Sequence, residues 1–256
     1  MKSSSIATIL TLLSHATAKT WNNTGKGAIL LEEAFSLDYP ELDKAVGSAL
    51  PGQTIQELID NLADTHNQRV RWMNDLAVDY MVLSLSSPGI QTISNVTLAE
   101  EVATRANNDI AASISNNAMI FGAFAALSMH NATQAANELK RCVQELGFHG
   151  ALLNDFQQAG PDNMLKRKVP EGIPMNRTLS SYWRTNIWET TSGDFATELP
   201  KFHRSVIGED RILYSVDYPF AMMQQGAEWL PSFHQSKKTK LDFVRNTAIK
   251  LLKLDG

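Results

Sequence analysis

The stretch Arg211-Ile-Leu-Tyr-Ser-Val-Asp217-Tyr-Pro-Phe220 is typical of a buried strand that delivers a carboxylate at its end and is then stopped by a proline. A similar stretch, Ala28-Ile-Leu-Leu-Glu32-Glu-Ala-Phe35, lies near the other end of the chain. In a barrel of parallel strands, the C-terminal tips of the first and last strands meet in one pocket. The two stretches therefore predict that Glu32 and Asp217 lie together as candidate metal ligands.

Composition limits the classes of protein to which the chain can belong. Its 256 residues are 43% hydrophobic and carry a formal net charge of -4, which suits one large domain or two small ones. This mild charge does not indicate a nucleic-acid surface, and no apolar run reaches the roughly 18 residues of a membrane span. Cys142 is the only cysteine, which excludes an intrachain disulfide and a cysteine-based zinc site.

The first residues have the pattern of a signal peptide. Lys2 precedes the apolar run Ile6–Leu13, and Ala16-Thr-Ala18 fits a cleavage site, so residues 1–18 are predicted to direct the chain to the secretory pathway or outside the cell. The alternative is an N-terminal extension on a cytoplasmic enzyme. Four sequons mark candidate glycosylation sites, although such triplets are also common by chance, at Asn22, Asn95, Asn131 and Asn176.

Apolar runs and helical periodicity alternate along the chain. Strands are expected at 27–35, 79–86, 121–128, 149–155, 186–193 and 211–217, and helices within 53–78, 98–117, 132–146, 194–207, 221–233 and 240–254. Gly147 is the expected C-cap of the third helical stretch. This order predicts an α/β fold with a parallel sheet. The six strands are fewer than the eight of a closed barrel, and the pattern fails between 157 and 180.

Six segments follow one another in an order that resembles a known family. They are Gly27-Ala-Ile-Leu-Leu-Glu-Glu-Ala-Phe35, Asp79-Tyr-Met-Val-Leu-Ser-Leu-Ser-Ser-Pro-Gly89, Phe121-Gly-Ala-Phe-Ala-Ala-Leu-Ser-Met129, Glu145-Leu-Gly-Phe-His-Gly-Ala-Leu-Leu-Asn154, Thr190-Thr-Ser-Gly193 and Asp210-Arg-Ile-Leu-Tyr-Ser-Val-Asp-Tyr-Pro-Phe220. The set resembles the amidohydrolase-related decarboxylases, especially fungal 2,3-dihydroxybenzoate, salicylate and γ-resorcylate decarboxylases. The resemblance covers nearly all of the chain after about residue 25.

The resemblance implies a TIM-barrel-like fold with one divalent metal ion (zinc, magnesium or manganese) at the C-terminal face. It implies the decarboxylation of a small aromatic carboxylic acid of the hydroxybenzoate type, without an organic cofactor, by a chain that can form a homo-oligomer. Glu32 would be the metal ligand on strand 1, and Asp217 the ligand on strand 8 with a part in proton transfer. Ala34 occupies a position where many members have histidine and some have alanine.

The chain also departs from the family. A His-Pro-Arg-like motif on strand 5 and a Gly-His-x-Gly-Glu motif on strand 6 supply metal ligands in the family, and this sequence contains neither. The domain over 25–256 is therefore expected to be shortened near 156–180, to about six of eight strands. The alternative function is a catalytically impaired remnant with a binding or structural role, and a weaker alternative is a metal-dependent hydrolase.

Three further residues are candidates for substrate binding. Trp188, Thr190 and Ser192 alternate on one face of a predicted strand and can line a pocket for an aryl acid, although packing inside the barrel explains them equally well. Glu33 is interpreted as half of a solvated pair with Glu32, and Lys166-Arg-Lys168 as a solvated loop.

Overall fold

The structure is a computed structural model that describes residues 21–42, 50–152, 181, 185 and 187–255. The predicted signal peptide, the sequon at Asn176, the basic Lys166–Lys168 stretch and the shortened region near 156–180 lie outside the described residues.

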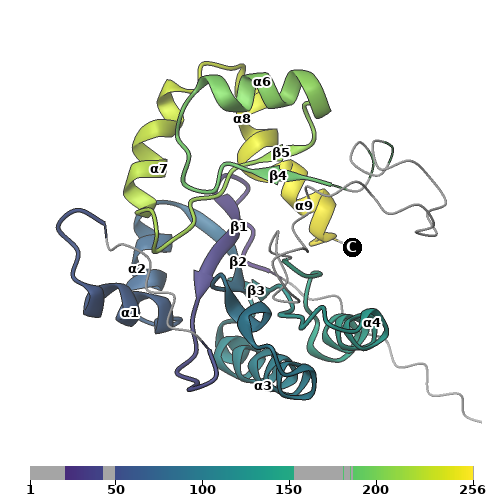
Figure 1. The fold of residues 1–256 in the computed structure, drawn as a ribbon. Coiled ribbons are helices and arrows are strands. Elements are labelled where there is room, and N and C mark those ends of the chain that lie inside the picture. The colour runs from purple at the N-terminus through teal and green to yellow at the C-terminus, as the bar shows by residue number, and fades with distance from the viewer. Residues whose placement is uncertain (1–20, 43–49, 153–180, 182–184, 186, 256) are drawn as a thin grey trace, which may run out of the picture.

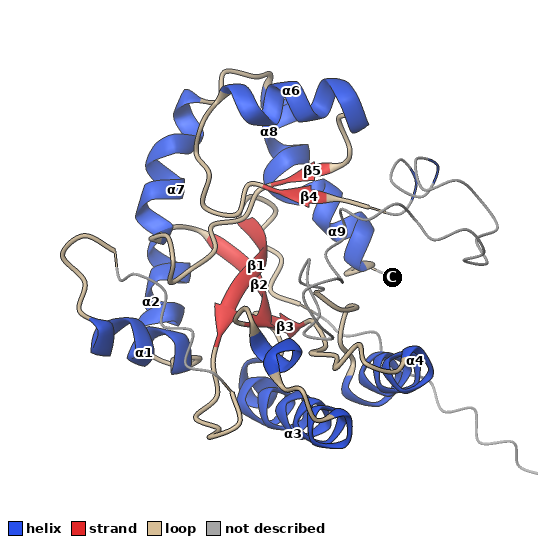
Figure 2. Ribbon diagram, viewed as in Figure 1, coloured by secondary structure: helices blue, strands red, loops and turns tan. Residues whose placement is uncertain are grey.

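Short parallel strands lie at the centre of the molecule and helices surround them (Figures 1 and 2). The strands are β1 (Ala28–Phe35), β2 (Val78–Leu85), β3 (Phe121–Ala123), β4 (Glu189–Thr190) and β5 (Ile212–Leu213). The α-helices are α1 (Ile55–Ala63), α2 (Gln68–Asp75), α3 (Val96–Ile114), α4 (Ala132–Arg141), α6 (Glu198–Ile207), α7 (Met223–Trp229), α8 (Lys237–Leu241) and α9 (Thr247–Leu252). Short 3-10 helices are η1 (Gly89–Thr92), η2 (Ser115–Asn117) and η4 (Leu230–Ser232), and π-helical turns are η3 (Cys142–Leu146) and η5 (Asp242–Asn246).

The strands form two parallel sheets whose edges meet. One sheet has the order β1-β2-β3 and the other joins β4 to β5. A further parallel bridge joins Ala125 to Ala151, where a fourth strand was expected. The end of β1 lies beside the chain that follows β5, because the Ala34 amide donates to the Tyr218 carbonyl at 2.8 Å. The sequence thus correctly predicted a parallel α/β arrangement with its first and last strands side by side.

Strand β1 carries an irregularity that determines where its acids point. Its register with β2 shifts between Leu30, which pairs with Met81, and Glu33, which pairs with Leu83. The bulged strand thus has one residue more than its partner over this interval, and such bulges re-aim side chains, often next to functional sites. Because of the shift, Glu33 pairs with Leu83, a residue whose side chain belongs to the layer between strands and helices.

Two apolar layers hold the strands. The larger cluster combines Leu30, Met81 and Leu83 of the strands with buried residues of the helices, such as Val102 of α3. A smaller cluster is formed by side chains on the opposite face of the strands, namely Trp21, Ile29, Leu31, Tyr80, Val82 and Leu213, together with residues near the C-terminus. Strands buried on both faces are expected in parallel sheets covered by helices.

Helix boundaries follow from local capping. Thr54 and Glu57 form a capping box at the start of α1, and Gly147 ends the third helical stretch in the left-handed conformation that was predicted (φ 70°). Asn95 and Asn131 cap α3 and α4, since their side chains accept hydrogen bonds from backbone amides of the first turn. Capping therefore gives both asparagines a structural role that does not depend on glycosylation.

Regular strand structure is shorter than the sequence predicted in the second half of the sheet. The strand expected over 121–128 has ladder bonds only over Phe121–Ala123, and those expected over 186–193 and 211–217 are regular only over Glu189–Thr190 and Ile212–Leu213. After Leu213, the chain bonds to neighbours irregularly; the Tyr214 amide, for example, donates to the carbonyl of Phe243. No described helix is long and apolar enough to cross a membrane.

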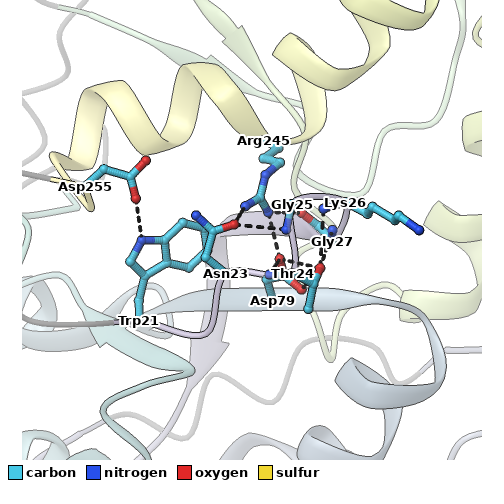
Figure 3. Close-up of polar contacts among 9 residues, drawn as sticks. All are labelled: Trp21, Asn23, Thr24, Gly25, Lys26, Gly27, Asp79, Arg245 and Asp255. Carbon is cyan, nitrogen blue, oxygen red and sulfur yellow. Dashed lines mark hydrogen bonds and ion pairs between the residues drawn. The ribbon is translucent and has the colours of Figure 1, made fainter.

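A buried polar network joins the N-terminal ends of β1 and β2 to the C-terminal helices (Figure 3). Arg245 Nη1 donates to Asp79 Oδ2 and to the Gly27 carbonyl, each at 2.7 Å. The Thr24 amide and hydroxyl also donate to the Asp79 carboxylate. Arg245 and Asp79 are 2% and 3% exposed, so this is a buried ion pair whose oxygens are well satisfied.

Candidate functional site

Glu32 and Asp217 lie at the C-terminal ends of adjacent strand segments, as the sequence predicted. Both are half-buried. Thr190, at the end of β4, donates from its hydroxyl to Glu32 Oε2. β1, β4 and the segment after β5 therefore bring an oxygen-rich group together on one side of the strands, where parallel barrels place their functional residues.

Asp217 has an unusual backbone conformation for a side chain in such a position. Its φ is +67°, a left-handed region that aspartate tolerates better than most residues. Its carbonyl accepts hydrogen bonds from the amides of Phe220 at 2.8 Å and Ala221 at 3.0 Å, so the chain turns directly at this residue. A turn is thus present at Asp217, and it carries the carboxylate at the strand end.

The sequence suggested that Glu33 and Glu32 form a solvated pair, but this is wrong, because Glu33 is 0% exposed. Its Oε1 accepts hydrogen bonds from the Ser215 hydroxyl and the Val216 amide, both at 2.9 Å, and from the Asp217 amide at 3.3 Å. Its Oε2 accepts from the Tyr218 amide at 2.8 Å. Both oxygens of Glu33 are therefore engaged by the segment that contains Asp217. The ionised form suits this arrangement, since each partner is a donor.

Ser215 links the bulge of β1 to the same segment. Its hydroxyl oxygen accepts hydrogen bonds from the amides of Leu31 at 3.0 Å and Glu32 at 2.8 Å, and its proton is donated to Glu33. In the bulged part of β1, two successive amides thus share one side-chain acceptor. Without it, two buried donors would lack a partner, which costs about 1–3 kcal/mol for each.

Arg69 of α2 supports this region from the helix side. It is 0% exposed, its Nη2 donates to the Ala34 carbonyl at 2.7 Å, and its guanidinium lies 4.7 Å from the centre of the Tyr218 ring. The Arg69 charge favours the ionised form of Glu33, although no hydrogen bond between the two is described. Arg69 therefore binds the backbone that follows Glu33 and packs on the Tyr218 ring, without pairing directly with the acids.

Burial and crowding of negative charge shift the acid equilibria. Burial, followed by the charges of Glu33 and Glu32, raises the pKa of Asp217 to about 8. Burial also raises the pKa of Glu33, while the hydrogen bonds from Val216, Tyr218 and Ser215 and the Arg69 charge oppose this. Such clustered carboxylates with a strongly raised pKa are typical of functional sites.

The chemistry of these donors fits a hard divalent cation. Carboxylate oxygens are ligands that magnesium and manganese prefer, and a cation would relieve the repulsion that raises the pKa of Asp217. Glu33 is not available as a ligand because the backbone uses both of its oxygens. In the described part of the chain, no group of three or more His, Cys, Asp or Glu side chains is arranged to hold a metal ion. Glu32 and Asp217 thus fit as a set of two ligands.

The predicted substrate residues are distributed unevenly. Thr190 contacts Glu32. The Arg211 guanidinium lies over the Trp188 ring, 4.2 Å from the ring centre. Trp188 also lines a cavity of about 460 Å³ near α6 and α9. Ser192 has a left-handed φ of 42°. Glu189, for which the sequence offered no explanation, bonds to His203 of α6.

Four of the five described histidines bond through their side chains to partners other than the two acids. His149 Nε2 lies 2.9 Å from the Tyr80 hydroxyl, as expected for a residue that opens a strand at the opposite face. His130 is half-buried and bonds to the Ile93 carbonyl. His66 and His234 lie in loops, after α1 ends at Ala63 and η4 ends at Ser232. The fully buried Cys142 has its pKa raised to about 12 by burial and by Glu138, which is the opposite of activation.

Comparisons with known proteins agree with this architecture. A profile of the amidohydrolase family matches residues 60–167. The chain is 38% identical to the γ-resorcylate decarboxylase of a Polaromonas species over 164 residues, which are 64% of this chain and 46% of that enzyme. It is 26% identical to the γ-resorcylate decarboxylase of a Rhizobium species over 327 residues, covering 90% of this chain and 99% of that enzyme. Because this alignment is longer than the 256 residues of the chain, it contains positions of the relative that have no counterpart here.

A solved structure extends the likeness to three dimensions. A dihydroxybenzoic acid decarboxylase from Polaromonas, with bound manganese and the inhibitor 2-nitroresorcinol, superposes with a TM-score of 0.79 at 26% identity, covering 90% of this chain and 98% of that one. The order of the strands, the paired acids at their C-terminal ends and these full-length relatives point to one conclusion. The chain is similar in sequence and in fold to the amidohydrolase-related decarboxylases.

Proposed function

We propose that the chain carries out the metal-dependent, non-oxidative decarboxylation of an aromatic acid of the hydroxybenzoate type. The observation that carries the proposal is the placement of Glu32 and Asp217 on adjacent strand ends, close enough for the charge of Glu32 to raise the pKa of Asp217. In this reaction the bond from the ring to the carboxylate breaks, carbon dioxide leaves, and a proton replaces it on the ring carbon. The balance therefore needs a proton donor but no oxidant and no organic cofactor.

Each residue of the site has a task in this reaction. Glu32 and Asp217 would hold the divalent cation, which would neutralise the crowded carboxylates and polarise the oxygens of the bound acid. The Thr190 hydroxyl fixes the orientation of the Glu32 carboxylate. Asp217 is also the group proposed to transfer the proton to the ring carbon, since its carboxyl lies beside Glu32 at the strand ends. Ser192 is proposed to line the aryl pocket with Thr190, whereas Trp188 lines the separate cavity near α6 and α9.

The barrel is proposed to be a shortened one of about six strands. The support is the length of the Rhizobium alignment together with the absence of the strand 5 and strand 6 motifs from the sequence. The interval in question lies between Ala151 and Glu189, where most residues are outside the described part of the chain. A homo-oligomer is also proposed, as the resemblance to the family implies.

A second candidate is a catalytically impaired remnant that binds an aryl acid or a metal without turnover. It is favoured by one specific observation, that the described residues offer only two acids and no histidine as ligands. Metal bound by two carboxylates leaves most coordination positions to water, and such a site is weak.

A secretory location is proposed from the leader, with Asn22 as the candidate glycosylation site, since it is exposed and the other exposed sequons, Asn95 and Asn131, cap α3 and α4. Expression in a eukaryotic host tests this idea. A decrease in mass after treatment with an endoglycosidase, lost in Asn22→Gln, is the expected result. Retention of the full chain inside the cell with its first 18 residues intact would contradict it.

The experiment that tests the function combines metal analysis with an activity assay. The purified chain is loaded with manganese, dialysed, and its metal content is measured; we expect about one divalent ion per chain. Decarboxylation of 2,6-dihydroxybenzoate, 2,3-dihydroxybenzoate and salicylate is then followed by chromatography of the phenolic product.

Two variants separate site chemistry from general effects. Glu32→Gln is expected to lose both manganese and turnover, while Glu189→Gln, an acid of the neighbouring strand that pairs with His203, is expected to keep both. A folded wild-type chain that binds manganese but converts none of the three acids would favour the remnant. A folded chain that binds no manganese would contradict both the metal site and the proposed reaction.

A further inference from the structure

Glu33 differs from its neighbour Glu32 in what its oxygens do. It is completely buried, and both of its carboxylate oxygens accept hydrogen bonds from residues 215–218. Three of these donors are successive backbone amides, those of Val216, Asp217 and Tyr218. One side chain of β1 thus holds the backbone on both sides of Asp217. This arrangement is stronger than ordinary neighbouring contacts, because hydrogen bonds to a charged acceptor are roughly twice as strong as neutral ones.

The bulge of β1 completes the arrangement. By strict alternation, Glu33 would share a face with Ile29 and Leu31, but the register shift between Leu30 and Glu33 reverses the pattern. Glu32 then approaches the hydroxyl of Thr190, while Glu33 approaches the backbone of the strand segment after β5. Ser215 stabilises the reversal by accepting the amides of Leu31 and Glu32.

We propose that Glu33 is a positioning residue that fixes Asp217 in space relative to Glu32, and so sets the separation of the two proposed metal ligands. The backbone of Asp217 has a left-handed φ of 67°, which is less favourable for a non-glycine residue than the right-handed region and persists only when surrounding contacts hold it. Glu33 supplies one such contact at the Asp217 amide and two at its flanking residues. This inference rests on the proposed function, since it assigns Glu33 to the same metal site.

The test measures manganese affinity and local backbone protection in Glu33→Gln. The amide group of glutamine has the shape of the carboxylate but presents an N–H₂ donor toward one of the backbone N–H groups, so at least one of the four hydrogen bonds is lost. Free manganese is measured by its electron paramagnetic resonance signal during titration of the folded protein. Manganese affinity is expected to fall about 10–100-fold, as is typical when a partner that orients metal ligands is removed.

The matched control is Asp79→Asn. Asp79 is also a buried carboxylate that accepts several hydrogen bonds, but it lies at the opposite end of the strands. Its replacement is expected to reduce stability while leaving manganese affinity unchanged. If Glu33→Gln binds manganese as tightly as wild type, the inference is overturned, and Glu33 serves only stability.

Two further measurements test the inference if Glu33→Gln does not fold or if the wild type binds no manganese. Should Glu33→Gln fail to fold, Ser215→Ala removes one donor to Glu33 and the acceptor of two β1 amides, and a smaller decrease in manganese affinity is expected. Should wild type bind no manganese, the proposed metal site fails, and hydrogen exchange decides on Glu33. Faster exchange of the amides at 216–218 in Glu33→Gln than in Asp79→Asn supports the positioning role, and equal exchange overturns it.

Discussion

The two ends of the β1–β2 strand pair handle buried carboxylates in opposite ways. At the N-terminal end, Asp79 pairs with Arg245 and collects further hydrogen bonds from Thr24, so that its charge is balanced (Figure 3). At the C-terminal end, Glu33 is satisfied by backbone amides, and Glu32 and Asp217 add negative charge beside it. The same residue types thus stabilise one end and accumulate unbalanced charge at the other.

The difference parallels the division of tasks that is known for parallel barrels. Residues at the N-terminal face contribute to stability, while those at the C-terminal face contribute to function. Charge compensation is the physical criterion that separates them here: a carboxylate with its own guanidinium needs no ligand, whereas a group of carboxylates whose repulsion raises a pKa to about 8 can be neutralised by a cation or a proton.

The largest expected effect is a loss of activity on replacing Asp217 at the C-terminal end of the strands. Asp217→Asn should lower kcat about 10²–10⁴-fold, the range for removing a group that transfers a proton, and should not lower stability because it removes one of three crowded acids. Turnover of 2,6-dihydroxybenzoate and urea unfolding of the same sample are the measurements. A variant that retains turnover but unfolds more easily would mean that Asp217, like Asp79, contributes to stability and not to catalysis.

Asp79→Asn should have the opposite profile. It leaves the buried Arg245 without its charged partner, which typically costs about 3–5 kcal/mol of unfolding free energy. Urea unfolding measures the loss, and turnover by the remaining folded protein should stay near the wild-type value. A loss below about 1 kcal/mol would mean that Arg245 finds compensation from Asn23 or the Gly27 carbonyl, to which it also bonds.

A third carboxylate, Glu138 of α4, extends the comparison to pH. Burial opposes its ionisation, but hydrogen bonds from Arg141, Asn107 and Cys142 outweigh this and lower its pKa to about 2. A lowered pKa in the folded state means that the contribution to stability is complete above the ordinary value of 4.5 and is lost as the pH falls toward 2. The shift corresponds to about 3 kcal/mol.

The measurement is unfolding free energy between pH 7 and pH 3 for wild type, Glu138→Gln and Glu145→Gln, the last being an exposed acid of the same helical stretch. Glu138→Gln should be less stable at neutral pH and show a shallower decline in acid than the other two. Parallel curves for all three proteins would contradict the assigned role of the Glu138 cluster.

Much of the fold could be predicted from apolar periodicity. β1, β2 and the helices between them lie within a few residues of their expected limits, because long apolar runs and the capping box of Thr54 and Glu57 define them locally. The proximity of Glu32 and Asp217 followed from the geometry of parallel strands alone. The later strands are regular over fewer residues than expected, since side chains such as Ser215 and Thr191 replace backbone ladder bonds there.

The roles of Glu33, Thr190 and Glu189 could not be predicted. Alternation assigns each strand residue to a face, but the β1 bulge is a register property that depends on the partner strand and leaves no signal in the sequence of β1 itself. Likewise, the bond from Glu189 to His203 joins a strand to a helix and becomes visible only when the two pack together. The sequence predicts the helices and strands, but it does not predict the contacts between them.

The smallest expected effect probes how closely the Asp79 end is packed. A methyl group on Gly27 would lie 2.0 Å from Asp79 Oδ1 and 2.9 Å from the Ala77 carbonyl oxygen, so Gly27→Ala must displace the carboxylate or the backbone. Such overpacking costs about 1–3 kcal/mol, or about 2–4 °C in Tm for each kcal/mol in a chain of this size. Calorimetry measures the shift, and manganese affinity should be unchanged because the site lies at the other end of the strands. An unchanged Tm would show that the Asp79 carboxylate can move without loss, and the contrast between a rigid, charge-balanced end and a charge-rich functional end would then rest on electrostatics alone.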